Sequence, residues 1–223
     1  MYKRQPIGTV NAKTSEITFN KTIESVTASA TGTGSTGGTV GTDKDTAQVS
    51  IGSTVSYKLS TKFPNYAETI KAENMTEYSI TDIPSAGLTL VDKGSAGLDK
   101  DDFVVTVGGT ATTDFTVAAE GSNGFKISFA NAFVLTNKTK DVVVTYDATV
   151  NKNAVVGTAG NPNKATLKFD NNYYEGGTSK EIPDDGKVFT TKLVVKVVLT
   201  GSLVPFFVVI TAVTVYVPFA RFF

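Results

Sequence analysis

The sequence predicts an all-β fold, an antiparallel β-sandwich of immunoglobulin-like type. From residue 16 onward, Thr, Val, Ile, Phe and Tyr recur in short alternating runs, and these residue types favour strands. Gly, Asn, Asp and Pro separate the runs, as turn residues do. No helical period of useful length appears. The number and spacing of the runs suit two packed sheets.

The strands are expected in the following order along the chain. Each is a run of alternating apolar and polar residues bounded by turn signals. They are ITFNKTIESV (17–26), STVSYKLST (53–61), TEYSITDI (76–83), DFVVTV (102–107), FKISF (125–129), DVVVTYDATV (141–150) and NKATLKF (163–169).

Two polar stretches are expected to be loops. The stretch 27–46 is rich in Gly, Ser and Thr and offers little to bury, so it predicts a mobile surface loop. The stretch 170–187 carries turn signals at EGG, IPDD and DGK and is expected to lead out of the domain. Strand signal resumes at VFTTKLVVKVV.

These features divide the chain into a lead at 1–15, which is non-native or a linker, a sandwich at 16–187 and a third segment at 188–223. Within the third segment, 197–220 is uncharged for 24 residues, long enough for a membrane-spanning helix. It is also rich in Val, Thr, Phe and Tyr and contains two prolines and a glycine, which favours the truncated start of a second β domain. The opening MYKRQPIGTV lacks the apolar run of a signal peptide, so we expect the chain to begin within a longer precursor.

Composition excludes several classes of function. The chain has 223 residues with 21 basic and 21 acidic side chains, so no basic stripe is available for nucleic acid. It has no Cys, His or Trp, which excludes disulfides, a thiolate nucleophile, an imidazole base and a Cys/His zinc site. We expect no cofactor and no metal.

Three polar residues fall on faces that should be apolar. Side chains alternate between the two faces of a strand, so Lys21 shares a face with Ile17, Phe19 and Ile23. The same count puts Asp82 on the face of Tyr78 and Ile80, and Asn163 on the face of Ala165, Leu167 and Phe169. Burying such groups is unfavourable unless they satisfy one another. The early and late strands of a sandwich can lie side by side, so we expect the three to meet.

Two explanations of this trio are open. Lys21 and Asp82 could be a buried ion pair, with Asn163 satisfied by backbone groups. Alternatively, the Lys21 amine attacks the Asn163 side-chain amide, forming an amide bond and releasing ammonia. Burial would favour the neutral amine and a protonated Asp82, which could polarise the Asn163 carbonyl and relay a proton. Asn171 has the same parity as Asn163 and is a rival acceptor.

Three segments resemble one known family when they occur in this order. YSITDIPSAGLTLV is followed by VVVTYDATVNKNAVVGTAGNPNKATLKF and then by VFTTKLVVKV. Together they resemble the isopeptide-forming domain of Gram-positive fimbrial backbone subunits, the sortase-assembled pilins, over roughly residues 16–197. The pilin-motif lysine and the LPxTG-type signal of that family are not visible, so the chain resembles a fragment.

The resemblance implies a collagen-adhesin type A sandwich whose first and last strands are joined by a lysine to asparagine bond, assisted by an acid on a middle strand. By position, Lys21 in ITFNKTI corresponds to the lysine, Asp82 in ITDIPSAGLT to the acid and Asn163 in NPNKATLKF to the asparagine. These are the residues that alternation singles out. The crosslink is therefore favoured over the ion pair.

The expected function is structural: a module of an extracellular, cell-wall fimbrial shaft that performs one self-directed reaction without turnover. Expected partners are neighbouring pilin subunits, joined by sortase in the precursor. The alternative is an adhesin module that binds a host protein or carbohydrate through Tyr173–Tyr174 or the Gly/Thr-rich loop. No nucleic acid is expected, and membrane contact only through 197–220.

Two acidic clusters suggest weaker alternatives. Asp99, Asp101 and Asp102 could form the acid/base pair of a hydrolase, but their crowding in GLDKDDF is more typical of a solvated turn. DKD at 43–45 lacks the ligand spacing of an EF-hand calcium site.

Overall fold

A computed structural model of the chain describes residues 16–28, 38–94 and 97–190. The described strands, in order, are β1 (Asn20–Thr27), β2 (Thr39–Val40), β3 (Thr46–Val49), β4 (Thr54–Lys62), β5 (Tyr78–Pro84), β6 (Leu88–Leu90), β7 (Val104–Val107), β8 (Thr110–Ala111), β9 (Thr116–Glu120), β10 (Gly124–Phe129), β11 (Asp141–Val150), β12 (Asn161–Asp170) and β13 (Ser179–Thr190). One short helix, α1 (Asn131–Thr136), and two 3₁₀ turns, η1 (Ala72–Asn74) and η2 (Lys100–Asp102), complete the described elements.

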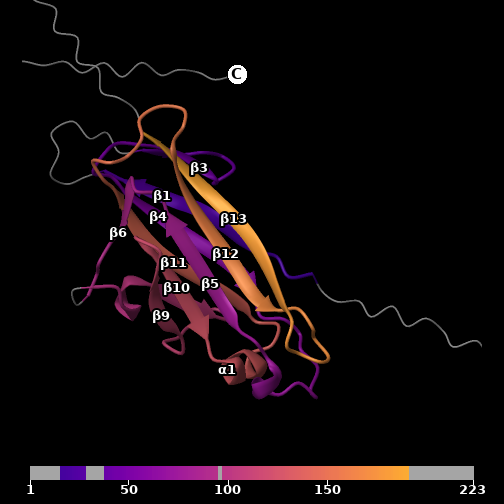
Figure 1. Ribbon diagram of the computed structural model, residues 1–223. Helices are drawn as coiled ribbons and strands as arrows, with labels where there is room; N and C mark the ends of the chain where they lie inside the picture. The colour runs from indigo at the N-terminus through magenta and orange to yellow at the C-terminus, as the bar shows by residue number, and fades with distance from the viewer. Residues whose placement is uncertain (1–15, 29–37, 95–96, 191–223) are drawn as a thin grey trace, which may run out of the picture.

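The strands form two sheets packed face to face, which confirms the all-β sandwich (Figure 1). One sheet has the order β1-β4-β11-β7-β8, with β6 also paired to β11. The other has the order β2-β3-β13-β12-β5-β10-β9. All pairs are antiparallel except β3 with β13, which is parallel. The helix α1 lies at the end of the sandwich opposite β3 (Figure 1).

Alternation of side chains produces the core between the sheets. Along β11, every second residue from Val142 to Val150 is buried, and β12 and β4 show the same period of two. The buried aromatic and aliphatic side chains of both sheets form one hydrophobic cluster. Each of the expected strands is present, and its observed boundaries differ from the expected ones by up to three residues.

The expectation that 170–187 leads out of the domain is wrong, because its second half, residues 179–187, belongs to strand β13. This strand pairs with β12 from Asn161↔Val188 to Asp170↔Ser179. Only the last four residues of β13 have β3 on their other side, so among the described residues the first part is a free sheet edge. Charged side chains and Pro183 are typical of such an edge. These residues resembled turn signals because they face water rather than the core.

The sandwich also continues past the expected boundary at 187. Val188 is fully buried and Thr190 is 1% exposed, so the end of β13 belongs to the core. In the expected loop at 27–46, the described part contains β2 and the start of β3. The lead at 1–15 and the apolar segment 197–220 lie outside the described residues. Across residues 16–28, 38–94 and 97–190, no helix is long and apolar enough to cross a membrane.

Candidate functional site

Lys21 extends from β1 into the space between the sheets. Its register partner on β4 is Leu59, and its backbone N–H donates to the Asp184 carboxylate of β13 at 2.6 Å. The side chain is completely buried. A buried ammonium group is costly unless it is paired, so the surroundings of Lys21 determine its protonation state.

Asp82 and Asn163 enter from the opposite sheet. They lie on neighbouring strands, β5 and β12, where Asp82 pairs with Ala165 and Asn163 pairs with Pro84. The two side chains are therefore diagonal neighbours on the inner face, and both are fully buried. Lys21 Nζ contacts Asp82 Oδ2 directly. The structure thus places the lysine and the acid in contact and the asparagine beside the acid.

The route by which the residues meet differs from the expectation. The strands β1 and β12 do not lie side by side, because β1 ends one sheet and β12 is internal to the other. Lys21 instead reaches across the core. A lysine is long enough for this, and its carbon chain packs among the apolar side chains on the way. A bond between Lys21 and Asn163 would therefore join the two sheets.

Tyr146 of β11 completes the cluster and is the residue that sequence reasoning missed. Its hydroxyl oxygen lies 2.7 Å from Lys21 Nζ and accepts a hydrogen bond from Asn163 Nδ2 at 2.7 Å. It donates to Asp82 Oδ2 at 2.8 Å. Side-chain alternation along β11 could have identified it. Tyr146 lies on the same inward face as the valines of this strand, so its hydroxyl is buried and needs a hydrogen-bond partner.

Aromatic rings enclose the lysine amine. Lys21 Nζ lies 4.8 Å from the ring centroid of Tyr57 and 5.3 Å from that of Tyr146. The two rings stack on each other at 5.3 Å, and Phe125 packs edge-on against Tyr146 at 4.9 Å. These rings keep water away from the polar atoms and hold the amine in place.

The cluster favours uncharged forms of Lys21 and Asp82. Burial lowers the pKa of Lys21 from its ordinary value, against the opposing attraction of Asp82. Burial also raises the pKa of Asp82, although Lys21, Tyr146 and Asn163 act to lower it. An uncharged amine is a nucleophile, and a protonated carboxyl is a hydrogen-bond donor. The site can therefore provide the two species that amide exchange requires.

The carboxyl of Asp82 and the amide of Asn163 each have one buried oxygen, Oδ1, that makes no hydrogen bond within the described residues. A proton on Asp82 Oδ1 that is donated to Asn163 Oδ1 would satisfy both atoms. The same hydrogen bond would draw electrons from the Asn163 carbonyl and stabilise negative charge on its oxygen during attack.

Asn171 is not part of this cluster. The strand β12 ends at Asp170, whose carboxylate accepts backbone N–H groups from Asn172, Gly177 and Thr178 and so turns the chain. Asn171 follows the end of the strand and is exposed to solvent. Alternation stops with the strand, so the parity that Asn171 shares with Asn163 has no meaning there.

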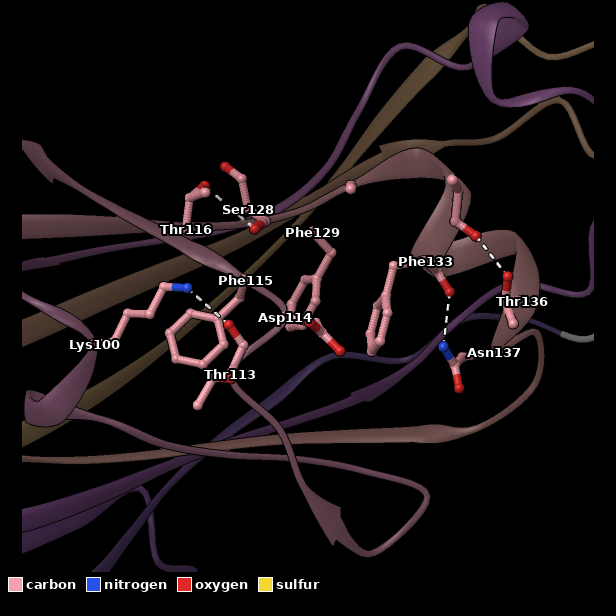
Figure 2. A pocket seen from close by; sticks show the side chains of 12 residues that line it. Lys100, Thr113, Asp114, Phe115, Thr116, Ser128, Phe129, Phe133, Thr136 and Asn137 are labelled. Atoms are coloured by element: carbon pink, nitrogen blue, oxygen red, sulfur yellow. Dashed lines mark hydrogen bonds between the residues drawn. The ribbon is translucent and has the colours of Figure 1, made fainter.

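The residues suggested for ligand binding do not form a joint platform. Tyr173 is 9% exposed and packs edge-on against Tyr66 at 5.5 Å, whereas Tyr174 is 61% exposed. The described surface has an open groove of about 730 Å³ beside α1, lined by Phe115, Phe129 and Phe133. Figure 2 shows the Lys100 amine directed at the neighbouring backbone carbonyl of Thr113, to which it donates at 2.8 Å. The groove is separate from the Lys21 cluster.

The acidic residues of the hydrolase alternative organise backbone instead. Asp102 is buried, which differs from the expected solvated turn, and accepts N–H groups from Lys93 and Asp99. Asp99 accepts from the Asp101 N–H and caps η2. Asp43 accepts from the Asp45 N–H in a turn. In the part of the chain that the structure describes, no three acidic side chains gather as metal ligands.

Comparison with known proteins relates this chain to bacterial surface proteins. No protein-family model matches the chain. The trypsin-resistant surface T6 protein of Streptococcus pyogenes serotype M6 is 33% identical in an alignment of 171 residues that covers 72% of this chain and 30% of that protein. The chain is related to the Gram-positive backbone pilins. It spans about a third of the length of this pilin relative.

Solved pilin structures have the same fold. The T6 backbone pilin of S. pyogenes superimposes with a TM-score of 0.55 at 22% identity, covering 78% of this chain and 36% of that one. BcpA, the major pilin subunit of Bacillus cereus, gives 0.54 at 17% identity, covering 79% and 41%. A C-terminal fragment of the major pilin GBS80 of Streptococcus agalactiae gives 0.53 at 16% identity, covering 79% and 57%. The matched region is only part of each of these longer pilin chains.

Proposed function

We propose that this pilin domain is a structural module of an extracellular bacterial pilus shaft, stabilised by an intramolecular bond between Lys21 and Asn163. The observation that carries the proposal is the convergence of Lys21, Asp82, Asn163 and Tyr146 in the buried interior between the sheets. An enzyme that acts on external substrates would instead need its polar groups in an open cleft. The domain would react once, with itself.

The proposed reaction balances as follows. The neutral Lys21 amine attacks Cγ of Asn163 and forms a carbon–nitrogen bond, while the carbonyl electrons move to Oδ1. Asp82 stabilises that oxygen by hydrogen bonding. The bond from Cγ to Nδ2 then breaks, Nδ2 leaves as ammonia with one proton taken from the former amine, and the carbonyl re-forms.

The partners in this proposal are neighbouring pilin subunits, linked through sortase in the full-length precursor. A crosslink inside each domain would suit such a chain, because a shaft under load fails at its weakest domain. The T6 relative is described as trypsin-resistant, and a bond between the sheets would hinder the local opening that proteases need.

The intact mass of the purified full chain under denaturing conditions tests the crosslink. We expect the wild type to be lighter than its sequence by one ammonia, and Lys21→Ala and Asn163→Ala to have their full sequence masses. Asp82→Ala should retain most of its ammonia, because the neutral proton donor is lost. Full sequence mass in the wild type would falsify the crosslink and leave a buried polar cluster.

Two matched controls separate the site from its surroundings. Lys164 is an exposed lysine next to Asn163, and Asn171 is the exposed rival acceptor. Lys164→Ala and Asn171→Ala should both lose ammonia as completely as the wild type. If Asn171→Ala kept its ammonia while Asn163→Ala lost it, the acceptor would be Asn171.

A further inference from the structure

One hydroxyl touches both nitrogens of the proposed exchange. Tyr146 Oη lies 2.7 Å from Lys21 Nζ, the nitrogen that attacks, and 2.7 Å from Asn163 Nδ2, the nitrogen that leaves. It also lies 2.8 Å from Asp82 Oδ2. Asp82 also contacts the Lys21 amine, but Tyr146 is hydrogen-bonded to Asn163 Nδ2, the amide nitrogen that leaves as ammonia.

Amide exchange requires a proton to move from Lys21 Nζ to Asn163 Nδ2. After attack, the former lysine nitrogen carries one proton too many, and the former amide nitrogen lacks the proton with which it can leave as ammonia. In water, solvent would carry this proton. Lys21 and Asn163 are fully buried and Tyr146 is 1% exposed, so a protein group has to carry it.

We propose that Tyr146 is a catalytic residue that shuttles this proton. Its oxygen accepts a proton from Lys21 Nζ while its hydroxyl proton passes to Asn163 Nδ2. The tyrosine therefore ends the step as it began, with one proton. This inference rests on the proposed crosslink and assigns Asp82 mainly to the carbonyl oxygen.

The change of geometry at Asn163 makes the transfer possible. In the starting amide, Nδ2 has no basic lone pair and donates its hydrogen bond to Tyr146. Once Cγ becomes tetrahedral, Nδ2 is an amine and can accept a proton. The Tyr146 hydroxyl proton, which is donated to Asp82 Oδ2 in the starting structure, then turns toward Nδ2 by rotation about the C–O bond. Burial raises the pKa of Tyr146 well above its ordinary value, so the hydroxyl gives up its proton only as it receives another.

Tyr57 provides a matched control in the same cage. Its ring stacks on Tyr146 and lies as close to the Lys21 amine. Its buried hydroxyl is near enough to Asn163 to influence the pKa of Tyr57, but within the described residues it forms no hydrogen bond of good geometry. Replacing either tyrosine with phenylalanine keeps the aromatic wall. Only Tyr146→Phe removes a hydroxyl that bridges the reacting nitrogens.

The experiment measures the rate of crosslinking in the full chain. Protein purified from inclusion bodies in denaturant, before the site has formed, is diluted to refold, and samples are quenched into denaturant for intact mass. Near-ultraviolet circular dichroism follows folding in parallel. We expect Tyr146→Phe to lose ammonia roughly 100-fold more slowly than the wild type, the size of a general acid–base contribution, and Tyr57→Phe to stay within about threefold.

Each outcome has a separate meaning. If Tyr146→Phe matches the wild type, or if Tyr57→Phe is slowed equally, the shuttle is overturned while the crosslink stands. If the wild type itself never loses ammonia, the proposed function fails and the shuttle fails with it. If Tyr146→Phe does not fold, the full chain with 3-fluorotyrosine placed at position 146 alone decides, because this residue keeps the hydroxyl but makes it more acidic: a changed rate of ammonia loss supports the shuttle, and an unchanged rate overturns it.

Discussion

At the scale of single residues, the feature that matters is the proton count of Lys21 and Asp82. The lowered pKa of Lys21 would by itself make stability rise with pH, and the raised pKa of Asp82 would by itself make it fall. The neutral pair has its one titratable proton on Asp82, and the ion pair has it on Lys21, so both forms bind the same number of protons. The two opposite dependences of stability on pH therefore cancel at pH values where the pair as a whole holds one proton. The environment, rather than solvent pH, then sets the fraction of neutral amine.

This cancellation predicts a flat pH profile for crosslinking. After refolding, the rate of ammonia loss should change by less than about twofold between about pH 6 and pH 9, because the pair neither gains nor loses a proton there. Intact mass against time at each pH measures it, with tyrosine fluorescence as the control for folding. A rise approaching tenfold per pH unit would show that Lys21 first releases its proton to water.

At the scale of elements, an ion cluster at Glu77 ties three strands of one sheet. Glu77 precedes β5 and pairs with Lys126 of β10 at 2.9 Å and Lys168 of β12 at 2.8 Å, and it accepts from Ser79. Partial burial acts to raise the pKa of Glu77, but the hydrogen bonds from Lys168, Lys126 and Ser79 outweigh it and lower the pKa to about 2. The carboxylate therefore holds the start of β5 to both neighbouring strands.

The sign of this pKa shift defines a prediction. A depressed carboxyl pKa stabilises the fold above the ordinary value of 4.5, and the benefit disappears as pH falls toward about 2. Allowing for solvent screening, Glu77→Gln should lower the free energy of unfolding by about 1 to 2 kcal/mol at neutral pH and by progressively less below pH 4.5.

Urea unfolding in an Asn163→Ala background measures this effect without the crosslink. Glu73, whose ion pair with Lys71 is largely exposed, provides the control, and Glu73→Gln should have almost no effect. Equal losses for Glu77→Gln at neutral and strongly acidic pH would contradict the electrostatic explanation.

At the scale of the whole molecule, the proposed bond determines the path of force. Tension applied to the two ends of the chain enters before β1 and leaves after β13. A bond from Lys21 to Asn163 would carry that tension directly from one sheet to the other, so residues 22–162 would bear none of it. Closing a loop of about 140 residues would also stabilise the domain by about 5 kcal/mol through the entropy of the unfolded chain.

Single-molecule pulling of the full chain tests this force path. We expect Asn163→Ala to extend about 480 Å further than the wild type on unfolding, because about 140 more residues become free to stretch at about 3.4 Å each. Lys21→Ala should behave in the same way, and Lys164→Ala like the wild type. Equal extension of wild type and Asn163→Ala would mean that no covalent link protects the interior.

The sequence by itself determined which side chains face inward. Alternation along a strand is a local property, so it identified Lys21, Asp82 and Asn163 as buried before any strand was paired. The same local rule failed at Asn171, because β12 ends at the turn formed by Asp170. It also failed along β13, where an edge strand faces water and imitates a loop.

Only the tertiary structure decided which inward-facing groups meet. The reach of Lys21 from one sheet to the other, the diagonal placement of Asp82 and Asn163 and the bridging hydroxyl of Tyr146 all depend on strand order and register. Those depend on contacts between residues far apart in the chain. The direction of a side chain follows from its own strand, whereas its neighbours follow from the packing of the whole sandwich.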